Sequence, residues 1–425
     1  MISRIPITDL SPAVNFGGEL VPVKAVAGEV IAVTATIFRE GHDALGAHTL
    51  LFDDKGKEIA RTPMREIWRG GDRFEGTITI PARGEFNYAI EAFDDPFATW
   101  EHDSEIKIAA DIDVELCCTI GKLIFEEKLN EDPSANKLLS PAIKALTDTS
   151  LAPANRFSQA TTPEIRAYFV ANPLRRLVSL SELIPVRADR ERALVGAWYE
   201  FFPRSEGAIV DAHGRITSGN FATAANRIPA VAAMGFDVLY LPPIHPIGTA
   251  HRKGRNNTLT PSDTDPGVPW AIGNVEGGHD AINPALGTMA DFETFVSIAK
   301  KNNIEIALDL ALQASPDHPW VKSSPEWFTT RPDGTIAYAE NPPKKYQDIY
   351  PINFDNDYAG ILAEVLRVIR LWVSKGVNIF RVDNPHTKPV HFWQEVMSVI
   401  HKESPDVVFL AEAFTKPAMM HALGK

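Results

Sequence analysis

The sequence has few cysteines, no long apolar run and a shortage of positive charge. Only two of its 425 residues are cysteines, and these two, Cys117 and Cys118, are adjacent. Adjacent cysteines suit neither a disulfide framework nor the spaced ligands of a zinc site, so we expect a reducing compartment. No apolar run approaches the ~20 residues of a membrane span, and the first residues lack the apolar stretch of a secretory signal. We therefore expect a soluble, cytoplasmic protein.

The charge balance argues against polyanionic partners. Lys and Arg number 42 against 55 Asp and Glu, which gives a formal net charge of −13. Such a chain repels phosphate backbones and anionic lipid headgroups, so we expect neither nucleic acid nor a membrane as a partner. With 44% hydrophobic and 23% charged residues, the composition is that of a globular protein, and the length predicts about three domains.

The first part of the chain, residues 1–112, has the pattern of short β-strands. In residues 28–38 the apolar side chains are mostly spaced by two, and turn residues such as those at 53–56 separate the strands. We predict an N-terminal β-sandwich of the immunoglobulin type. Residues 113–185 change to a helical period and predict a helical insertion, which either packs on its own sandwich or forms a dimer surface. Further strands are expected at 48–52, 74–80 and 87–93.

Residues 186–425 alternate apolar strand-like runs with helix-like ones. Near-continuous apolar strands alternating with helices indicate a parallel sheet buried on both faces, so the candidates are a doubly wound sheet and a (β/α)8 barrel. Segments 242–288 and 311–357 are too long for plain connections and are predicted to be functional insertions at the carboxyl ends of the strands. The strands are expected at 195–202, 236–241, 304–310, 377–383 and 407–412, and the helices near 220–234, 289–302, 358–375 and 389–403.

The last three of these strands each end in an acidic residue: Asp309, Asp383 and Glu412. Neighbouring strands lie about 4.7–4.9 Å apart, and a retaining glycosidase needs two carboxyl groups about 5–5.5 Å apart. Asp383 and Glu412 could therefore form such a pair. Arg381, on the same face of its strand as Asp383, can keep that carboxylate ionised. The alternative is a buried Arg–Asp pair with a structural role alone.

Segments 380–383, 409–412 and 308–309 resemble, in order and spacing, the signature regions of the α-amylase family of retaining α-glucan enzymes. Segments 241–248 and 278–288 are similar to those that follow the second strand in that family. The resemblance implies a (β/α)8 barrel of the α-amylase type, with Asp383 as nucleophile and Glu412 as general acid/base. Because these carboxylates do the chemistry, we expect no metal and no organic cofactor.

One branch of the family is favoured. Amylases usually have a histidine four residues beyond the aspartate of the third strand, where this chain has Gln313. Four segments, 198–205, 251–257, 341–348 and 381–389, closely resemble the maltosyltransferases that use α-maltose 1-phosphate to extend α-1,4-glucans. That resemblance implies a substrate-binding set to which we add Arg381. The set is Lys253, Gln313, Asp348 and Asn384 around the maltosyl phosphate, with Lys344 and Tyr346 near the phosphate.

Charge supports this interpretation, because a sugar phosphate in the cleft of an acidic protein needs local cations. The lysines at 253, 344 and 345 lie in the two insertions, although a solvated loop is the plain alternative for each. The sequence holds only five of the eight expected strands and lacks counterparts of the family's third carboxylate, of a Lys–Tyr pair that touches the donor and of a C-terminal β domain. We therefore expect a truncated or partial product whose parallel-strand edges are exposed.

The leading hypothesis is a maltosyltransferase that acts on α-maltose 1-phosphate and an α-1,4-glucan, and that is a homodimer in its complete form. A hydrolytic amylase or a branching enzyme is the alternative among enzymes. A third hypothesis is that the chain is a catalytically inactive fragment, because strands six to eight are lacking.

Overall fold

The computed structural model describes residues 3–68 and 70–425. The chain forms two compact units, residues 1–191 and 192–425. No helix within the described ranges is long and apolar enough to cross a membrane.

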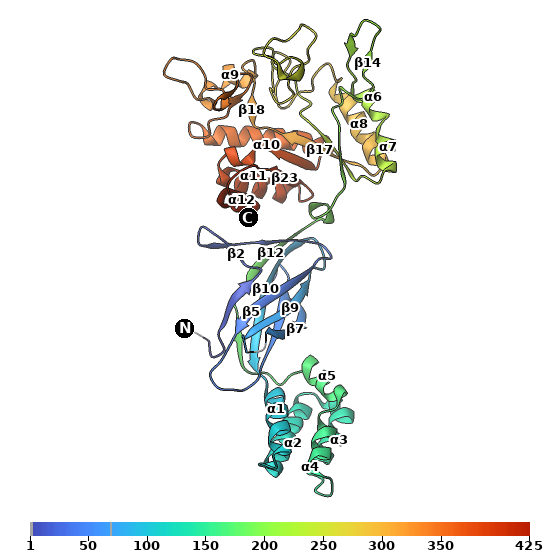
Figure 1. The fold of residues 1–425 in the computed structure, drawn as a ribbon, viewed down its shortest axis with the longest axis vertical. Coiled ribbons are helices and arrows are strands. Elements are labelled where there is room, and N and C mark those ends of the chain that lie inside the picture. The colour runs from blue at the N-terminus through green and yellow to red at the C-terminus, as the bar shows by residue number, and fades with distance from the viewer. Residues whose placement is uncertain (1–2, 69) are drawn as a thin grey trace. The chain divides into compact units, whose positions relative to one another are not determined.

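Two β-sheets form most of the first unit, and their strand pairs are antiparallel except for the parallel pair of β4 and β12 (Figure 1). A four-stranded sheet has the order β1-β5-β9-β8, and a six-stranded sheet has the order β4-β12-β10-β6-β7 with β11 also paired to β10. The bounds are β1 Ile7–Ser11, β4 Val23–Val26, β5 Val30–Ile37, β6 Leu45–Phe52, β7 Glu58–Pro63, β8 Arg65–Trp68, β9 Arg73–Thr79, β10 Gly84–Asp94, β11 Arg176–Leu180 and β12 Ile184–Asp189. A separate hairpin joins β2 Val14–Phe16 to β3 Glu19–Val21.

The two sheets bury side chains in one common core. In β5 the buried positions alternate, with Val33, Ala35 and Ile37 fully covered. Tyr88 and Ile90 of β10 belong to the same cluster of buried residues. The alternation of apolar residues along the sequence therefore reflects which side of each strand meets this core.

Five helices follow β10 and pack around a second core (Figure 1). They are α1 Pro96–Ala109, α2 Val114–Glu131, α3 Asn136–Thr147, α4 Pro153–Ala160 and α5 Pro163–Ala171, with the short η1 Pro133–Ala135. Stacked and edge-on aromatic rings fill the core. The rings of Phe97 and Phe169 are stacked, with their centroids 4.0 Å apart. Thr162 caps α5, because its side chain accepts a hydrogen bond from the Ile165 N–H.

The observed elements correct the prediction at both ends of the helical segment. Helices begin at Pro96 rather than at 113, because the Asp95 side chain accepts from the Ala98 N–H and Pro96 takes the first helical position. At the other end, β11 lies where helices were expected. Strand β12 lies mostly in the range expected to belong to the barrel, but it pairs with β10 and β4 of the first unit. In β12, Ile184 and Val186 point into the core at a period of two, so this strand returns the chain to the sheet.

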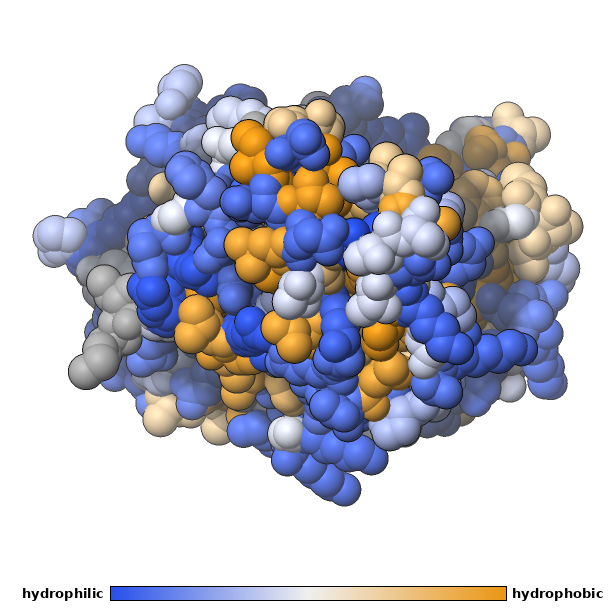
Figure 2. All heavy atoms as spheres, turned by 90° about the horizontal axis from the view of Figure 1, so that it is seen from below, coloured by the Kyte–Doolittle hydropathy of each residue, from blue (hydrophilic) through white to orange (hydrophobic). Residues whose placement is uncertain are grey.

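Helix α2 also carries apolar side chains at the surface. Leu116, Ile120 and Leu123 are spaced along one side of the helix and are 41–57% exposed. Figure 2 shows apolar residues exposed among polar ones over the surface seen in that view. We call these three residues of α2 the α2 strip.

The second unit is built on a five-stranded parallel sheet whose strands follow one another in chain order, β13-β16-β17-β22-β23. The strands are β13 Trp198–Glu200, β16 Val238–Leu241, β17 Glu305–Leu310, β22 Ile379–Asp383 and β23 Val408–Glu412. The helices that connect or follow them are α6 Phe221–Ala225, α7 Ile228–Ala233, α8 Met289–Lys301, α10 Tyr358–Ser374, α11 Val390–Glu403 and α12 Pro417–Gly424. All five expected strands and four expected helical stretches are confirmed within a few residues.

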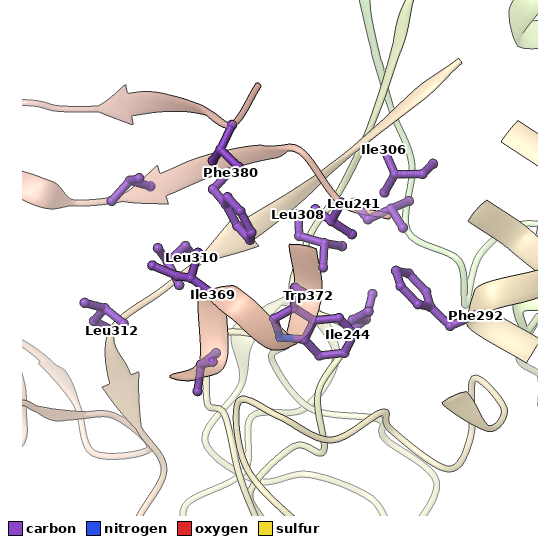
Figure 3. Close-up of a cluster of buried hydrophobic side chains, with 14 of the residues drawn as sticks. Leu241, Ile244, Phe292, Ile306, Leu308, Leu310, Leu312, Ile369, Trp372 and Phe380 are labelled. Atoms are coloured by element: carbon purple, nitrogen blue, oxygen red, sulfur yellow. The ribbon is translucent and has the colours of Figure 1, made fainter. Parts of the chain in front are cut away.

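Alternate residues of the strands serve the two faces of this sheet. Leu308, Leu310 and Phe380 join the large core that the helices cover, together with Phe292 of α8 and Trp372 of α10 (Figure 3). The intervening positions belong to the opposite face. That face has a small apolar cluster of Val238, Ala307 and Ile379, and further along the same strands it carries charged residues.

The two predicted insertions consist mainly of irregular segments with short elements. The first contains η3 Arg255–Asn257. The second contains β18 Gln313–Ala314, α9 Pro319–Ser323, η4 Pro325–Trp327, β19 Ala339–Asn341, β20 Lys344–Tyr346 and β21 Tyr350–Pro351. Elsewhere in the unit lie η2 Glu191–Ala193 at its start, the hairpin of β14 Ile209–Val210 with β15 Ile216–Thr217, and η5 Pro385–Thr387.

Candidate active site

Three carboxylates lie at the carboxyl ends of adjacent strands, on the face of the sheet that is not covered by the large core. The parallel register pairs Asp383 of β22 directly with Glu412 of β23. It also pairs Asp309 of β17 with Arg381 of β22. Asp309 and Asp383 are buried, whereas Glu412 is partly exposed.

One guanidinium binds all three carboxylates. Arg381 Nη1 donates to Asp309 Oδ2 at 2.7 Å and to Asp383 Oδ1 at 2.8 Å. Its Nη2 lies 3.1 Å from Glu412 Oε1. A planar guanidinium can address several carboxylate oxygens at once, so Arg381 fixes the spacing of these groups and offsets their mutual repulsion.

Asp309 is the most enclosed member of the cluster. The Tyr240 O–H donates to its Oδ2 at 2.5 Å, while its Oδ1 has no hydrogen-bond partner in the described part of the chain. Burial raises the pKa of Asp309 to about 7, against the opposing effects of Tyr240 and Arg381. Burial and the neighbouring Asp309 also raise the pKa of Tyr240. Asp309 is therefore suited to holding Arg381 in place.

Asn384 connects the two facing carboxylates. Its Nδ2 donates to Asp383 Oδ2 at 3.1 Å, and its backbone N–H points to Glu412 Oε2 at 3.4 Å. The residue has a positive φ of 44°. Asn tolerates this left-handed conformation better than most residues, which explains how the chain turns immediately after the strand.

Lys253 and Asp348 form a buried pair between the two insertions. Lys253 Nζ lies 3.8 Å from Asp348 Oδ1, and both side chains are almost fully buried. Gln313 lies four residues beyond Asp309, and its Nε2 donates to Trp270 O at 3.2 Å. In the described ranges, no hydrogen bond or ion pair joins Lys253 or Asp348 to the carboxylates at the strand ends.

Lys344 and Tyr346 lie apart from these groups. Both belong to β20, which pairs with β19 in a short hairpin. Both side chains are exposed. The structure thus gathers Asp383, Glu412, Arg381 and Asn384 in one cluster, joins Lys253 to Asp348 in a second, and leaves the β20 residues at the surface.

Hydrogen bonds between buried histidines hold the two insertions together. His279 Nδ1 lies 3.0 Å from His318 Nε2, and His279 Nε2 lies 2.8 Å from Ala311 O. His318 Nδ1 accepts from the Trp320 N–H at 3.0 Å. All these contacts are satisfied when each ring is neutral with its proton on Nε2. Burial lowers the pKa of His318 to about 3 and that of His279 well below its ordinary range, so both rings are neutral near pH 7.

A carboxylate also links the two insertions. The backbone N–H groups of Thr249 and Ala250 donate to Asp317 Oδ2 at 2.7 and 2.8 Å. The insertions therefore form one packed layer rather than two independent loops.

Two residues that contact the carboxylate cluster, Tyr240 and Lys388, were not singled out from the sequence. Tyr240 lies inside a predicted strand, and only its period-two relation to Val238 could have indicated that it shares a face with Asp309. Lys388 lies in a segment quoted for its resemblance, yet nothing local distinguished it from a surface lysine. Its Nζ donates to Asp383 O at 3.3 Å and to Asn384 O at 3.2 Å.

The arrangement can support attack by one carboxylate and proton transfer by another. Asp383 and Glu412 end neighbouring strands in direct register. Neighbouring strands lie about 4.7–4.9 Å apart, close to the carboxyl separation of about 5–5.5 Å that double displacement at a sugar carbon uses. Among residues 3–68 and 70–425, no group of three or more His, Cys, Asp or Glu is placed to hold a metal ion.

Comparison with known proteins shows what this chain is similar to. Residues 3–190 match domain N/S of Alpha-1,4-glucan:maltose-1-phosphate maltosyltransferase. The chain is 55% identical over 426 residues to Alpha-1,4-glucan:maltose-1-phosphate maltosyltransferase 2 of Streptomyces coelicolor, covering 100% of this chain and 63% of that protein. It is 52% identical over 428 residues to the maltosyltransferase of Arcanobacterium haemolyticum, covering 100% of this chain and 62% of that protein.

Among solved structures, an alpha-amylase from Lactobacillus plantarum is similar at a TM-score of 0.42 and 26% identity, over 51% of this chain and 45% of that one. The chain spans about 63% of the length of the maltosyltransferase relatives. The match to the Streptomyces coelicolor relative covers the whole of this chain. The chain is thus similar along its whole length to part of alpha-1,4-glucan:maltose-1-phosphate maltosyltransferases, and residues 3–190 match their domain N/S.

Proposed function

We propose that the protein carrying this chain transfers maltosyl units from α-maltose 1-phosphate to the non-reducing end of α-1,4-glucans and releases phosphate. The observation that carries the proposal is the direct pairing of Asp383 with Glu412, held by Arg381, in a chain that is 55% identical to a maltosyltransferase.

In the first step, Asp383 attacks C1 of the donor sugar. Its carboxylate oxygens accept hydrogen bonds from Arg381 and Asn384, which hold it in place for the attack. The bond from C1 to the phosphate oxygen breaks, and Glu412 gives its proton to the leaving phosphate. A covalent maltosyl ester with inverted configuration forms on Asp383.

In the second step, Glu412 acts as a base. It removes the proton from the 4-hydroxyl of a glucan end, and that oxygen attacks C1 as the ester bond to Asp383 breaks. Two inversions restore the α configuration, and Glu412 regains the proton that it gave in the first step. Glu412 is more exposed than Asp383, which suits a group that must meet both phosphate and acceptor.

The remaining predicted residues are assigned to substrate binding. We propose that Arg381 and Asn384 hold the reacting carboxylates, and that Lys253, Gln313 and Asp348 hold the maltosyl phosphate at the insertions. Lys344 and Tyr346 are proposed to approach the phosphate. Their exposure supports this, because a cation that binds a charged substrate must be accessible to it.

We propose the fold of each unit from the order of its strands. Doubly wound sheets reverse their strand order at a switch point, whereas the five strands here follow chain order with the carboxylates at one rim. This supports part of a (β/α)8 barrel of the α-amylase type. The two largely antiparallel sheets of the first unit share one core, which supports an immunoglobulin-like β-sandwich with the helices as an insertion.

Oligomeric state and compartment are proposed as well. The exposed α2 strip supports a homodimer formed through the helical segment, which size-exclusion chromatography with light scattering can test against a variant carrying Leu116→Glu. Cys117 and Cys118 are both free thiols, which supports a reducing, cytoplasmic location.

The function is tested by incubating the 425-residue chain, and the longest protein that its locus encodes, with α-maltose 1-phosphate and maltohexaose. We expect release of phosphate and products longer by two glucose units. Asp383→Ala should abolish both signals, whereas the control Asp355→Ala, which removes an exposed carboxylate, should leave them unchanged. Released maltose in place of longer glucans would identify a hydrolase, and no phosphate release by either protein would refute the proposal.

A further inference from the structure

Lys388 is a buried cation directly beneath the proposed nucleophile. It follows η5 and is only 7% exposed. Its ammonium donates to the carbonyl oxygens of Asp383 and Asn384, at 3.3 and 3.2 Å. These two carbonyls belong to the peptide groups on either side of Asn384. One side chain therefore fixes both peptide planes that define the left-handed conformation of that residue.

Neighbouring side chains secure the rest of the turn. The Thr387 hydroxyl also donates to Asn384 O at 2.8 Å, and Trp393 Nε1 donates to Pro385 O at 3.0 Å. Every carbonyl from Asp383 to Pro385 thus accepts a hydrogen bond from a side chain. Left-handed backbone costs energy for a residue with a side chain, so it persists only when such contacts determine it.

The conformation of this turn sets the donors that hold the two carboxylates. Asn384 reaches Asp383 through its side chain and Glu412 through its backbone N–H. If the peptide planes rotated, both donors would leave these positions. A displacement of about 1 Å at reacting groups can cost about a hundredfold in rate, so the support of this turn matters for the chemistry.

Charge gives Lys388 a second role. The charged groups that face it are Asp309 of β17, Asp383 and Arg381 of β22, and Glu412 of β23. Burial lowers the pKa of Lys388 to about 8, although the three carboxylates oppose this effect. The ammonium thus remains largely charged at neutral pH and, with Arg381, supplies two positive charges to this cluster of three carboxyl groups.

We propose that Lys388 is a positioning residue of the glycosyl-transfer site: its ammonium holds the turn at Asn384, and thereby the donors that align Asp383 with Glu412. This inference rests on the proposed function for its kinetic part and on the turn geometry for its structural part. A lysine that merely filled space would be replaceable by any unbranched side chain of similar length.

The test compares Lys388→Met, which keeps the length and removes the charge, with Lys388→Arg, which keeps the charge. Lys375→Met is the matched control, because it removes a lysine at the end of α10 that pairs with Glu293 of α8 and with none of the three carboxylates. For Lys388→Met we expect kcat/KM for maltosyl transfer to fall by about ten- to a hundredfold. We expect the acid limb of its pH profile to move up by about one unit, because a nearby cation lowers carboxylate pKa values. Lys388→Arg should recover part of both effects.

Two kinetic outcomes would overturn the proposal. One is activity of Lys388→Met within about twofold of wild type, which is the range expected of a surface substitution. The other is a loss that follows the unfolded fraction of the variant, measured by circular dichroism, while the pH profile of the remaining activity stays in place. Both would show that the lysine has no influence on the alignment of the carboxylates.

Failure of the proposed function is recognised separately. Wild type is assayed with α-maltose 1-phosphate and with α-maltosyl fluoride. Activity on the fluoride alone would refute the use of the phosphate donor. The Lys388 variants could then still be compared on the fluoride. If wild type uses neither donor, crystal structures of wild type and Lys388→Met decide. We expect Asn384 to lose its positive φ and its bond to Asp383 in the variant, and an unchanged turn would overturn the proposal.

Discussion

Asp383 and Glu412 face each other across neighbouring strands, and both bind the guanidinium of Arg381. Two carboxylates at adjacent strand ends repel each other, and a third, Asp309, lies on the next strand. Arg381 therefore offsets the repulsion between the carboxylates as well as fixing their positions. The cluster as a whole, rather than any single carboxylate, defines the site.

Replacing Arg381 by Met should be strongly destabilising. Removing one partner of a buried charge network leaves uncompensated charges, which costs about 3–5 kcal/mol. The surface pair of Arg370 and Glu403 gives a matched control, because exposed ion pairs contribute about 0–1 kcal/mol. Urea unfolding of Arg381→Met and Arg370→Met measures the difference. Equal losses for the two variants would mean that Arg381 is not the centre of a buried network.

Asp309→Asn should change how stability depends on pH. The pKa of Asp309 is about 7 in the folded protein and about 3.8 in the unfolded chain, so the folded state holds a proton that the unfolded state releases between these values. Its contribution to stability is full below about pH 3.8 and is lost as the pH rises through about 7.

We therefore expect the free energy of unfolding of wild type to fall relative to Asp309→Asn between pH 5 and 7, by up to about 1.4 kcal/mol per pH unit. Chemical unfolding of both proteins at several pH values in this window measures the two slopes. Parallel curves would show that Asp309 has an ordinary pKa and is ionised throughout.

The hydrogen-bonded histidines between the two insertions should give stability the opposite dependence on pH. The pKa of His318 is lowered to about 3 by burial and by the nearby His245, so the unfolded chain binds a proton that the folded state refuses. Stability therefore falls as the pH drops below about 6.5. His318→Asn keeps an oxygen that can accept from the Trp320 N–H and removes this titration.

We expect the variant to be less stable than wild type at pH 7, because His279 loses its partner, and to show a shallower loss of stability between pH 6.5 and 4.5. The control His213→Asn, at an exposed position, should reproduce the wild-type slope. A slope in His318→Asn equal to that of wild type would exclude His318 as a group that resists protonation.

The strands and helices of the second unit could mostly be predicted, because each is recognisable from a short stretch of sequence. The strands β22 and β23 are short apolar runs that each end in a carboxylate, and the strands follow chain order, so the facing positions of Asp383 and Glu412 follow from sequence alone. Their catalytic roles stay a prediction. In the first unit, β12 was missed because its alternation of buried and less buried residues is short and lies beside helices. The start of α1 was missed as well, although Asp95 and Pro96 are a recognisable helix start in the sequence.

Contacts between distant segments could not be predicted. The bond from Tyr240 to Asp309 joins residues 69 positions apart, and the contact of His279 with His318 joins the two insertions. Lys388 is close in sequence to Asp383, yet its burial depends on how the turn after β22 packs. A lysine in a loop is usually solvated, so only the folded arrangement distinguishes this one.

The last prediction concerns phosphate recognition by the hairpin of β19 and β20. Lys344 and Lys345 are adjacent exposed residues of β20, so their side chains point to opposite faces of the hairpin. If Lys344 binds the phosphate, Lys344→Ala should weaken use of α-maltose 1-phosphate about ten- to a hundredfold, because a charge-assisted hydrogen bond contributes about 1.5–3 kcal/mol.

The same variant should retain use of α-maltosyl fluoride, whose leaving group needs no such cation, and Lys345→Ala should change either donor by less than about 0.5 kcal/mol. The measurement is kcat/KM for each variant with each donor. Equal losses on the charged and neutral donors would show that Lys344 positions the sugar or the hairpin. Equal effects of Lys344→Ala and Lys345→Ala would point to the general charge of the loop, since only a specific contact distinguishes the two faces of one strand.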